Sequence, residues 1–151
     1  MHYWLMKSEP DTFSIDDLAT KAGQLEHWDG VRNYQARNFI RAMSVGDQAF
    51  FYHSSCDEPG IVGIVAIVRA AYPDPSAFDH NSPYYDPKSS PERPRWDMVD
   101  VRLLHRLQRL IPLGEIKRNR MLAAMHLVQR GNRLSVMPVT AAQWQAILKM
   151  Q

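Results

Sequence analysis

The sequence contains few residues of the kinds that hold small proteins together by covalent or metal links. Cys56 is its single cysteine, which excludes an internal disulfide and a multi-cysteine zinc site. The histidines and carboxylates follow no recognisable metal-ligand spacing, so we expect no metal and no other cofactor. The seven glycines are scattered and form no phosphate-binding loop, and there is no G-x-S-x-G motif.

Long apolar runs and a strong excess of charge are also missing. No stretch reaches the roughly 18 apolar residues of a membrane span, and the first residues do not have the pattern of a signal peptide. We therefore expect a cytoplasmic protein with no membrane partner. The 18 Lys and Arg against 16 Asp and Glu give a net charge of +2, which permits a nucleic-acid partner without arguing for one.

What remains has the composition of one globular domain spanning residues 1–151. Hydrophobic residues make up 45% and charged residues 23%, close to the averages for soluble domains. Apolar periodicity and turn residues predict strands over residues 3–6, 48–53, 61–70, 98–109 and 133–139. Capping signals and helical spacing predict helices over residues 14–18, 33–43, 113–119, 120–129 and 140–148. This pattern indicates an α+β fold with about five or six strands in a curled sheet or open barrel, flanked by short helices.

A proline-rich segment separates the two halves of this pattern. Six prolines fall between residues 73 and 94, which excludes a long helix or a central strand there. A loop of this length inside a small domain is usually functional or mobile.

Four tryptophans are candidates either for the core or for a binding site. Trp4 lies on a predicted strand and Trp144 on an amphipathic helix, where core packing is the expected role. Trp28 and Trp96 lie in loops beside turn residues and charges, and there a large ring either packs internally or lines a pocket.

Polar side chains stand at the ends of two predicted strands. Lys7 and Ser8 follow the first strand, and Tyr52-His53-Ser54 ends the second. These groups are either solvated strand exits or the walls of a cleft. A nucleophile–base pair formed by Cys56 and His53 lacks an orienting carboxylate or amide, so we expect no catalytic residues. The arginines of the C-terminal half are either a solvated surface or a footprint for phosphates.

Several stretches together resemble the EVE domain family. They cover essentially the whole chain in order, and the run that begins at Trp28 is the most specific of them. The matching stretches are residues 3–10 (YWLMKSEP), 28–38 (WDGVRNYQARN), 50–54 (FFYHS), 58–61 (EPGI), 72–74 (YPD), 85–87 (YDP), 96–101 (WxMVDV), 111–113 (IPL) and 133–135 (RLS).

The resemblance implies a PUA-like pseudo-barrel and a relation to YTH domains, which hold N6-methyladenine of RNA in an aromatic cage. It also implies a role in binding modified bases of DNA or RNA without altering them. The chain begins at the domain, without the basic N-terminal extension of nuclear members, so we expect no nuclear role. The ligand-binding residues that follow from this resemblance are Lys7, Ser8, Trp28, Arg32, Asn33, Tyr52, His53, Ser54, Ile61 and Trp96.

Within that set, the resemblance implies a different contact for each kind of side chain. Trp28 would stack on the base, while Ser8, Asn33, His53 and Ser54 would hydrogen-bond its polar edge. Ile61 would supply an apolar wall for an added methyl, and Lys7 or Arg32 would meet a phosphate or carbonyl oxygen. Two other functions stay open. The second hypothesis is a module that binds a small molecule or free nucleobase, and the third is an enzyme acting on nucleic acid. The modification, the choice of DNA or RNA and the oligomeric state are not determined by the sequence.

Overall fold

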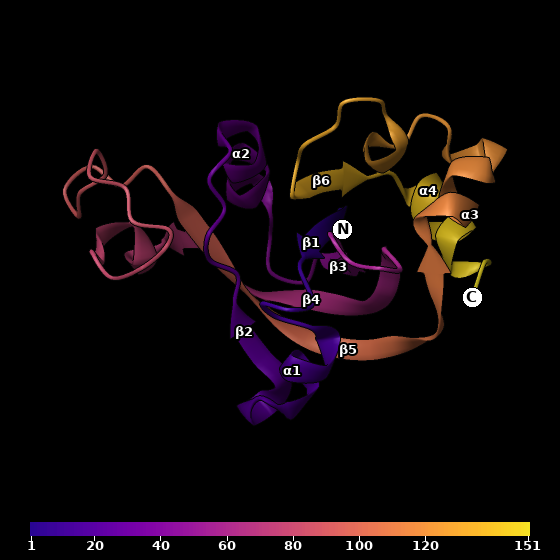
Figure 1. Ribbon diagram of the computed structural model, residues 1–151, viewed down its shortest axis with the longest axis horizontal. Coiled ribbons are helices and arrows are strands. Elements are labelled where there is room, and N and C mark those ends of the chain that lie inside the picture. Colours follow the sequence, from indigo (N-terminus) through magenta and orange to yellow (C-terminus); the bar gives the residue numbers. More distant parts are fainter.

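The computed structural model describes residues 1–151 and contains one strongly curled, six-stranded sheet (Figure 1). The strand order is β2-β5-β4-β3-β1-β6, in which β1 and β3 run parallel and the other neighbouring pairs run antiparallel. Because β2 and β6 remain as edges, the sheet bends without closing, and the expected open α+β barrel is confirmed. The strands are β1 (Tyr3–Ser8), β2 (Leu25–His27), β3 (Gln48–His53), β4 (Gly60–Pro73), β5 (Asp97–Pro112) and β6 (Val136–Val139).

Short helices connect the strands, and most of them begin where capping residues predict. Ser14 and Thr140 each form a capping box, and the Asn33 side chain accepts a hydrogen bond from the Ala36 N–H. The α-helices are α1 (Ile15–Thr20), α2 (Tyr34–Ala42), α3 (Leu113–Arg118) and α4 (Ala141–Leu148). The 3₁₀ turns are η1 (Ala22–Gln24), η2 (Pro75–Phe78), η3 (Arg120–Leu122) and η4 (His126–Val128).

The α-helix predicted over residues 120–129 is wrong, because the chain there forms only the turns η3 and η4. Met125 and Leu127 are both buried, yet in one α-helix they would point in nearly opposite directions. An extended Met125 between the two turns allows both side chains to reach the core. The last strand, β6, is also shorter than expected, and the three-residue edge strand β2 was too short to give a sequence pattern.

The core is centred on the parallel pair β1 and β3. Leu5, Met6, Phe50 and Phe51 are fully buried there, so this part of the sheet is covered on both faces. The first half of β4 is also covered on both faces, whereas from Arg69 onward the strand is partly or fully exposed. The rigid centre of the sheet positions the ends of β1 and β3, where the polar groups stand.

Residues 74–96, which contain five of the ten prolines, form a separate lobe at one end of the molecule (left in Figure 1). The lobe contains only the turn η2 and an isolated bridge between Ser90 and Arg93, in agreement with the expected absence of a long helix or central strand. At the lobe's base the Asp74 N–H donates to the Trp96 carbonyl at 2.9 Å.

Candidate functional site

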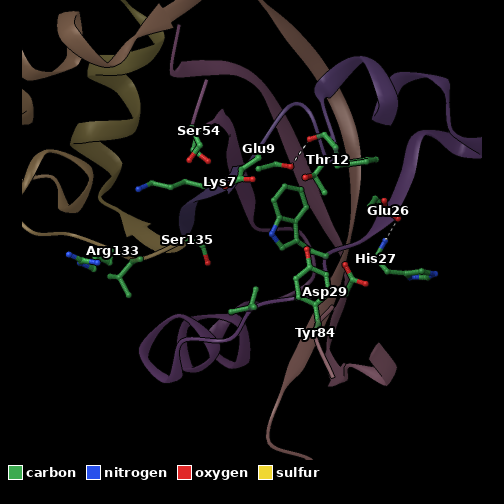
Figure 2. A pocket seen from close by; sticks show the side chains of 17 residues that line it. Lys7, Glu9, Thr12, Glu26, His27, Asp29, Ser54, Tyr84, Arg133 and Ser135 are labelled. Carbon is green, nitrogen blue, oxygen red and sulfur yellow. Dashed lines mark hydrogen bonds between the residues drawn. The ribbon is translucent and has the colours of Figure 1, made fainter. Parts of the chain in front are cut away.

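A cavity of about 420 Å³ opens where the ends of β1 and β3 meet the segment after β2 (Figure 2). Seventeen residues line it, and they come from five separate parts of the chain and a sixth contributed by the proline-rich lobe. The lining residues are 7–9, 12–13, 26–31, 54–55, 84 and 133–135.

Backbone hydrogen bonds bring these distant segments together. The Ser54 N–H donates to the Ser8 carbonyl at 3.0 Å, which joins the ends of β3 and β1. The Lys7 N–H donates to the Ser135 carbonyl at 2.8 Å, which brings the segment before β6 to the same place. The Trp28 N–H donates to the Val99 carbonyl of β5 at 2.8 Å. These hydrogen bonds hold the main chain around the cavity in place, so the cavity walls have little freedom to move.

Trp28 is mostly buried, with 7% of its surface exposed, but it lines the cavity and is not sealed off from it. Its ring packs edge-on against Phe51, at 5.4 Å between centroids and an angle of 86°. Its indole N–H makes no hydrogen bond within the protein, unlike those of Trp4 and Trp96, which donate to Asp47 and Asp86. No buried side-chain nitrogen or oxygen lacks a partner, so the Trp28 N–H is accessible to a ligand.

Tyr84 of the lobe supplies a second ring, which is held against Gly30. Gly30 has φ +78°, and a Cβ there would lie 2.6 Å from the Tyr84 ring. The Arg32 Nε donates to the Tyr84 carbonyl at 3.0 Å, and Arg32 Nη1 pairs with the fully buried Asp74 at 3.0 Å. Asp74 also accepts from the Gly30 N–H at 2.8 Å. This network fixes the lobe to the segment that carries Trp28.

The cavity is divided by charge. In Figure 2, Lys7 and Arg133 extend from one side, whereas Glu26 and Asp29 lie on the other. Partial burial lowers the pKa of Lys7, which forms no ion pair with a carboxylate. Partial desolvation, followed by the negative charges of Asp74 and Glu26, raises the pKa of Asp29. A guest therefore meets a hydrogen-bond donor side and an acceptor side.

Beyond Arg133 the surface continues into a second, shallower hollow of about 350 Å³. Arg133 and Leu134 line both spaces, and the second contains Arg130 together with amide side chains such as Asn33 and Gln129. The donor side of the main cavity thus leads into a polar, basic groove.

Four of the ten residues predicted as ligand-binding line the main cavity, and the other six lie outside it. Lys7, Ser8, Trp28 and Ser54 are at the cavity, although the Ser8 hydroxyl already donates to the Phe13 carbonyl at 2.5 Å. The six outside it are Arg32, Asn33, Tyr52, His53, Ile61 and Trp96.

Most of these six side chains support the fold around the cavity. Arg32 is held by the lobe network described above, and Asn33 caps α2 while lining the second hollow. Tyr52 is buried in the core, and burial raises its pKa to about 12. Ile61 is fully buried, and Trp96 stacks on Tyr34 with centroids 4.7 Å apart.

His53 is engaged by α1. Its Nε2 accepts a hydrogen bond from the Ile15 N–H at 3.1 Å, and burial lowers its pKa, an effect that the charge of Asp16 opposes. This ring nitrogen is therefore not free to act as a base toward Cys56.

Sequence reasoning missed several lining residues, mainly Asp29, Tyr84, Arg133 and Ser135. Asp29 belongs to the stretch 28–38 that resembles the EVE family, but no role was assigned to it, although it directly follows Trp28. Residues 133–135 were among the stretches that resemble the EVE family, and this was the available signal for them. Tyr84 lies in the proline-rich loop, where no local pattern indicates which side chain turns inward.

The comparisons with known proteins agree with this architecture. The EVE domain family model matches residues 2–150. Thymocyte nuclear protein 1 of Gallus gallus is 48% identical over 99% of this chain and 68% of its own length. A Pseudomonas putida protein of known structure is 55% identical, with a TM-score of 0.95 and 98% of both chains covered.

Two further structures were determined with nucleic acid. The human THYN1 protein in complex with DNA containing 5-methylcytosine is 46% identical, with a TM-score of 0.96 over 99% of this chain and 97% of that one. A YTH domain of Zygosaccharomyces rouxii in complex with N6-methyladenosine RNA is 14% identical, with a TM-score of 0.55 over 99% of this chain and 85% of that one, and so shares the fold alone. No helix here has the length and apolarity needed to cross a bilayer.

Proposed function

Because the chain belongs to the EVE domain family, we propose that it is a non-catalytic module that reads a modified base of DNA or RNA by holding the base in the Trp28 cavity. The observation that carries this proposal is the combination of a nearly buried indole, an N–H without a partner and polar walls in one cavity. The human THYN1 protein, which shares the fold and 46% of the sequence, binds DNA that contains 5-methylcytosine.

The cavity is suited to a base that has left its stack. A base inside a duplex is not accessible from all sides, so a reader takes it from a single strand or flips it out, at a cost of a few kcal/mol. Contact with an aromatic ring returns about 1–3 kcal/mol per base. Trp28 and Tyr84 offer such rings, and the unpaired donors and acceptors of the walls match the polar edge of a base.

The sugar and phosphates of the same strand belong on the donor side. Lys7 and Arg133 attract a phosphate, whereas Glu26 and Asp29 repel it, so the strand enters with its backbone toward Arg133. The basic hollow beyond Arg133 gives the next nucleotide a polar surface to follow.

Binding without chemistry fits the groups at the cavity. His53 is engaged by the Ile15 N–H, and no three metal-ligating side chains come together anywhere in residues 1–151. The cavity contains no nucleophile hydrogen-bonded to a base, the arrangement that covalent catalysis uses.

The test is a titration of wild type and Trp28→Ala with two single-stranded oligonucleotides that differ only by one 5-methylcytosine in place of cytosine. Wild type should prefer the methylated strand, and Trp28→Ala should lose about 1–3 kcal/mol of binding to it. Trp144→Phe, which alters a buried tryptophan that does not line the cavity, is the control for general damage. Equal affinity of wild type and Trp28→Ala for both strands would remove the proposal, and equally tight binding of the free nucleoside would favour a small-molecule module.

The expected cytoplasmic location receives no support from the comparisons, because the name of the animal relatives refers to the nucleus. The proposed partner, a modified nucleic acid, is the same in either compartment.

A further inference from the structure

Among the three acidic side chains at the cavity, Asp29 and Glu9 pair with no other residue, and of these two only Asp29 adjoins Trp28. Glu26 is occupied, since its Oε1 accepts from Lys21 Nζ at 3.1 Å and from the His27 N–H at 3.0 Å. The Asp29 carboxylate takes part in no ion pair, and its one hydrogen bond is to its own backbone N–H. Its nearest candidate cation, Arg32, is held by Asp74 and Ser76.

The third acid, Glu9, is also unpaired, but it lies elsewhere on the cavity wall. Glu9 follows the end of β1, whereas Asp29 directly follows Trp28 on the segment that Gly30 and Tyr84 fix in place. A base that contacts Trp28 and Tyr84 therefore has the Asp29 carboxylate at its edge, on the side opposite Lys7 (Figure 2).

A carboxylate at that place imposes a chemical requirement on the base. An ionised carboxylate only accepts hydrogen bonds, so it pairs with an exocyclic amino group and repels an exocyclic carbonyl oxygen. The indole N–H of Trp28 and the Lys7 ammonium only donate, so they suit the ring nitrogen and carbonyl acceptors of the same base. Cytosine has both features, one donor group at position 4 and acceptors at positions 2 and 3.

Resting on the function proposed above, we propose that Asp29 is the specificity residue of the cavity and selects bases of the cytosine type, which carry an amino group at position 4, against thymine or uracil. The selection is independent of the methyl group, because thymine carries the same methyl at position 5 as 5-methylcytosine. The two bases then differ only in their polar edge: position 4 carries an amino group in cytosine and a carbonyl oxygen in thymine, and the ring nitrogen at position 3 accepts in cytosine and donates in thymine.

The experiment uses three single-stranded DNA oligonucleotides that are identical except for one central base, which is 5-methylcytosine, thymine or cytosine. Wild type should bind the 5-methylcytosine strand at least about tenfold more tightly than the thymine strand, as expected for one well-placed pair. Asp29→Asn has the same size and an amide that donates to an oxygen or accepts from an amine. This variant should bring the two affinities to within about threefold of each other.

Glu9→Gln is the matched control, because it neutralises the other unpaired acid of the cavity and should keep the wild-type preference. Asp29→Asn should remain folded, because its surroundings already disfavour the charged carboxylate. A wild-type protein that binds thymine as tightly as 5-methylcytosine overturns the inference without reference to any variant. So does an Asp29→Asn protein that keeps the tenfold preference.

These outcomes separate the two proposals. A wild type that prefers 5-methylcytosine over cytosine, but does not distinguish it from thymine, leaves the reader function standing and removes the role of Asp29. A wild type with equal affinity for all three strands removes both.

Discussion

At the scale of single residues, the cavity depends on a few positions where the backbone or a neighbour allows only one kind of side chain. Gly30 is one of them, because its φ is positive and the Tyr84 ring occupies the space of a Cβ. Asp74 is another, since it holds both the Gly30 N–H and Arg32 from a fully buried position. Such residues shape the site without contacting a ligand.

Gly30→Ala should cost more stability than Gly46→Ala, and the difference measures the Tyr84 contact. Both glycines have positive φ, but the space around Gly46 is open. We expect a loss of about 1 kcal/mol for Gly46→Ala, from the left-handed backbone alone, and roughly 2 kcal/mol or more for Gly30→Ala. Urea denaturation of the two variants measures both values. Equal losses would mean that the Tyr84 ring moves aside freely.

At the scale of elements, the ends of helices and strands could be predicted because their signals are local. Ser14 and Asp17 form their capping box within a few residues, and the strand from Gln48 to His53 has the predicted bounds. The segment after Asn119 was misjudged because packing of both Met125 and Leu127 into the core overrode the local helical pattern. Local spacing contains no information of that kind.

The cavity was predicted only in part for the same reason. Lys7 and Ser135 are brought together by pairing of β1 with β6, and the lobe is attached through Arg32 and Asp74, 42 positions apart. No single-sequence pattern indicates these contacts. The family resemblance supplied Trp28, and the polar ends of β1 and β3 supplied Lys7, Ser8 and Ser54.

The link between β3 and α1 should make stability depend on pH through His53. Burial lowers the pKa of His53 from 6.5, and its Nε2 must be unprotonated to accept from the Ile15 N–H. The unfolded chain therefore binds this proton at higher pH than the folded protein does. The contribution to stability is present above about pH 6.5 and is lost as the pH falls through the lower pKa of the folded state.

Thermal melts at pH 7 and pH 5 measure this effect. We expect wild type to lose more stability between these values than His53→Gln, whose amide oxygen accepts a hydrogen bond without titrating. His80→Gln, at an exposed position of the lobe, is the control and should behave like wild type. The same pH dependence in His53→Gln and wild type would show that the Ile15 contact is not coupled to titration.

At the scale of the whole molecule, the distribution of charge matters more than its sum. A net charge of +2 gives little general attraction to phosphates, so we expect weak non-specific binding with a shallow dependence on salt. The proposed orientation places phosphates near Arg133, which borders both hollows. The salt dependence should therefore come from few residues.

Arg133→Ala should reduce the slope of log affinity against log salt by about 0.7, the value for one phosphate contact with a single strand. The affinity should fall by a similar factor for methylated and unmethylated strands, because a phosphate contact has no base preference. Arg102→Ala removes an exposed arginine of β5 away from the cavity and should leave the slope unchanged. An unchanged slope in Arg133→Ala would place the strand elsewhere.

The central claim, that a base enters the cavity beside Trp28, is tested most directly by the four indole N–H signals in a ¹⁵N NMR spectrum. The Trp28 signal is identified by its absence from Trp28→Phe. On addition of a strand with 5-methylcytosine, it should shift strongly, while those of Trp4 and Trp96, whose N–H groups are bonded to Asp47 and Asp86, should stay in place. A strand that binds while the Trp28 signal remains unmoved would contradict the account.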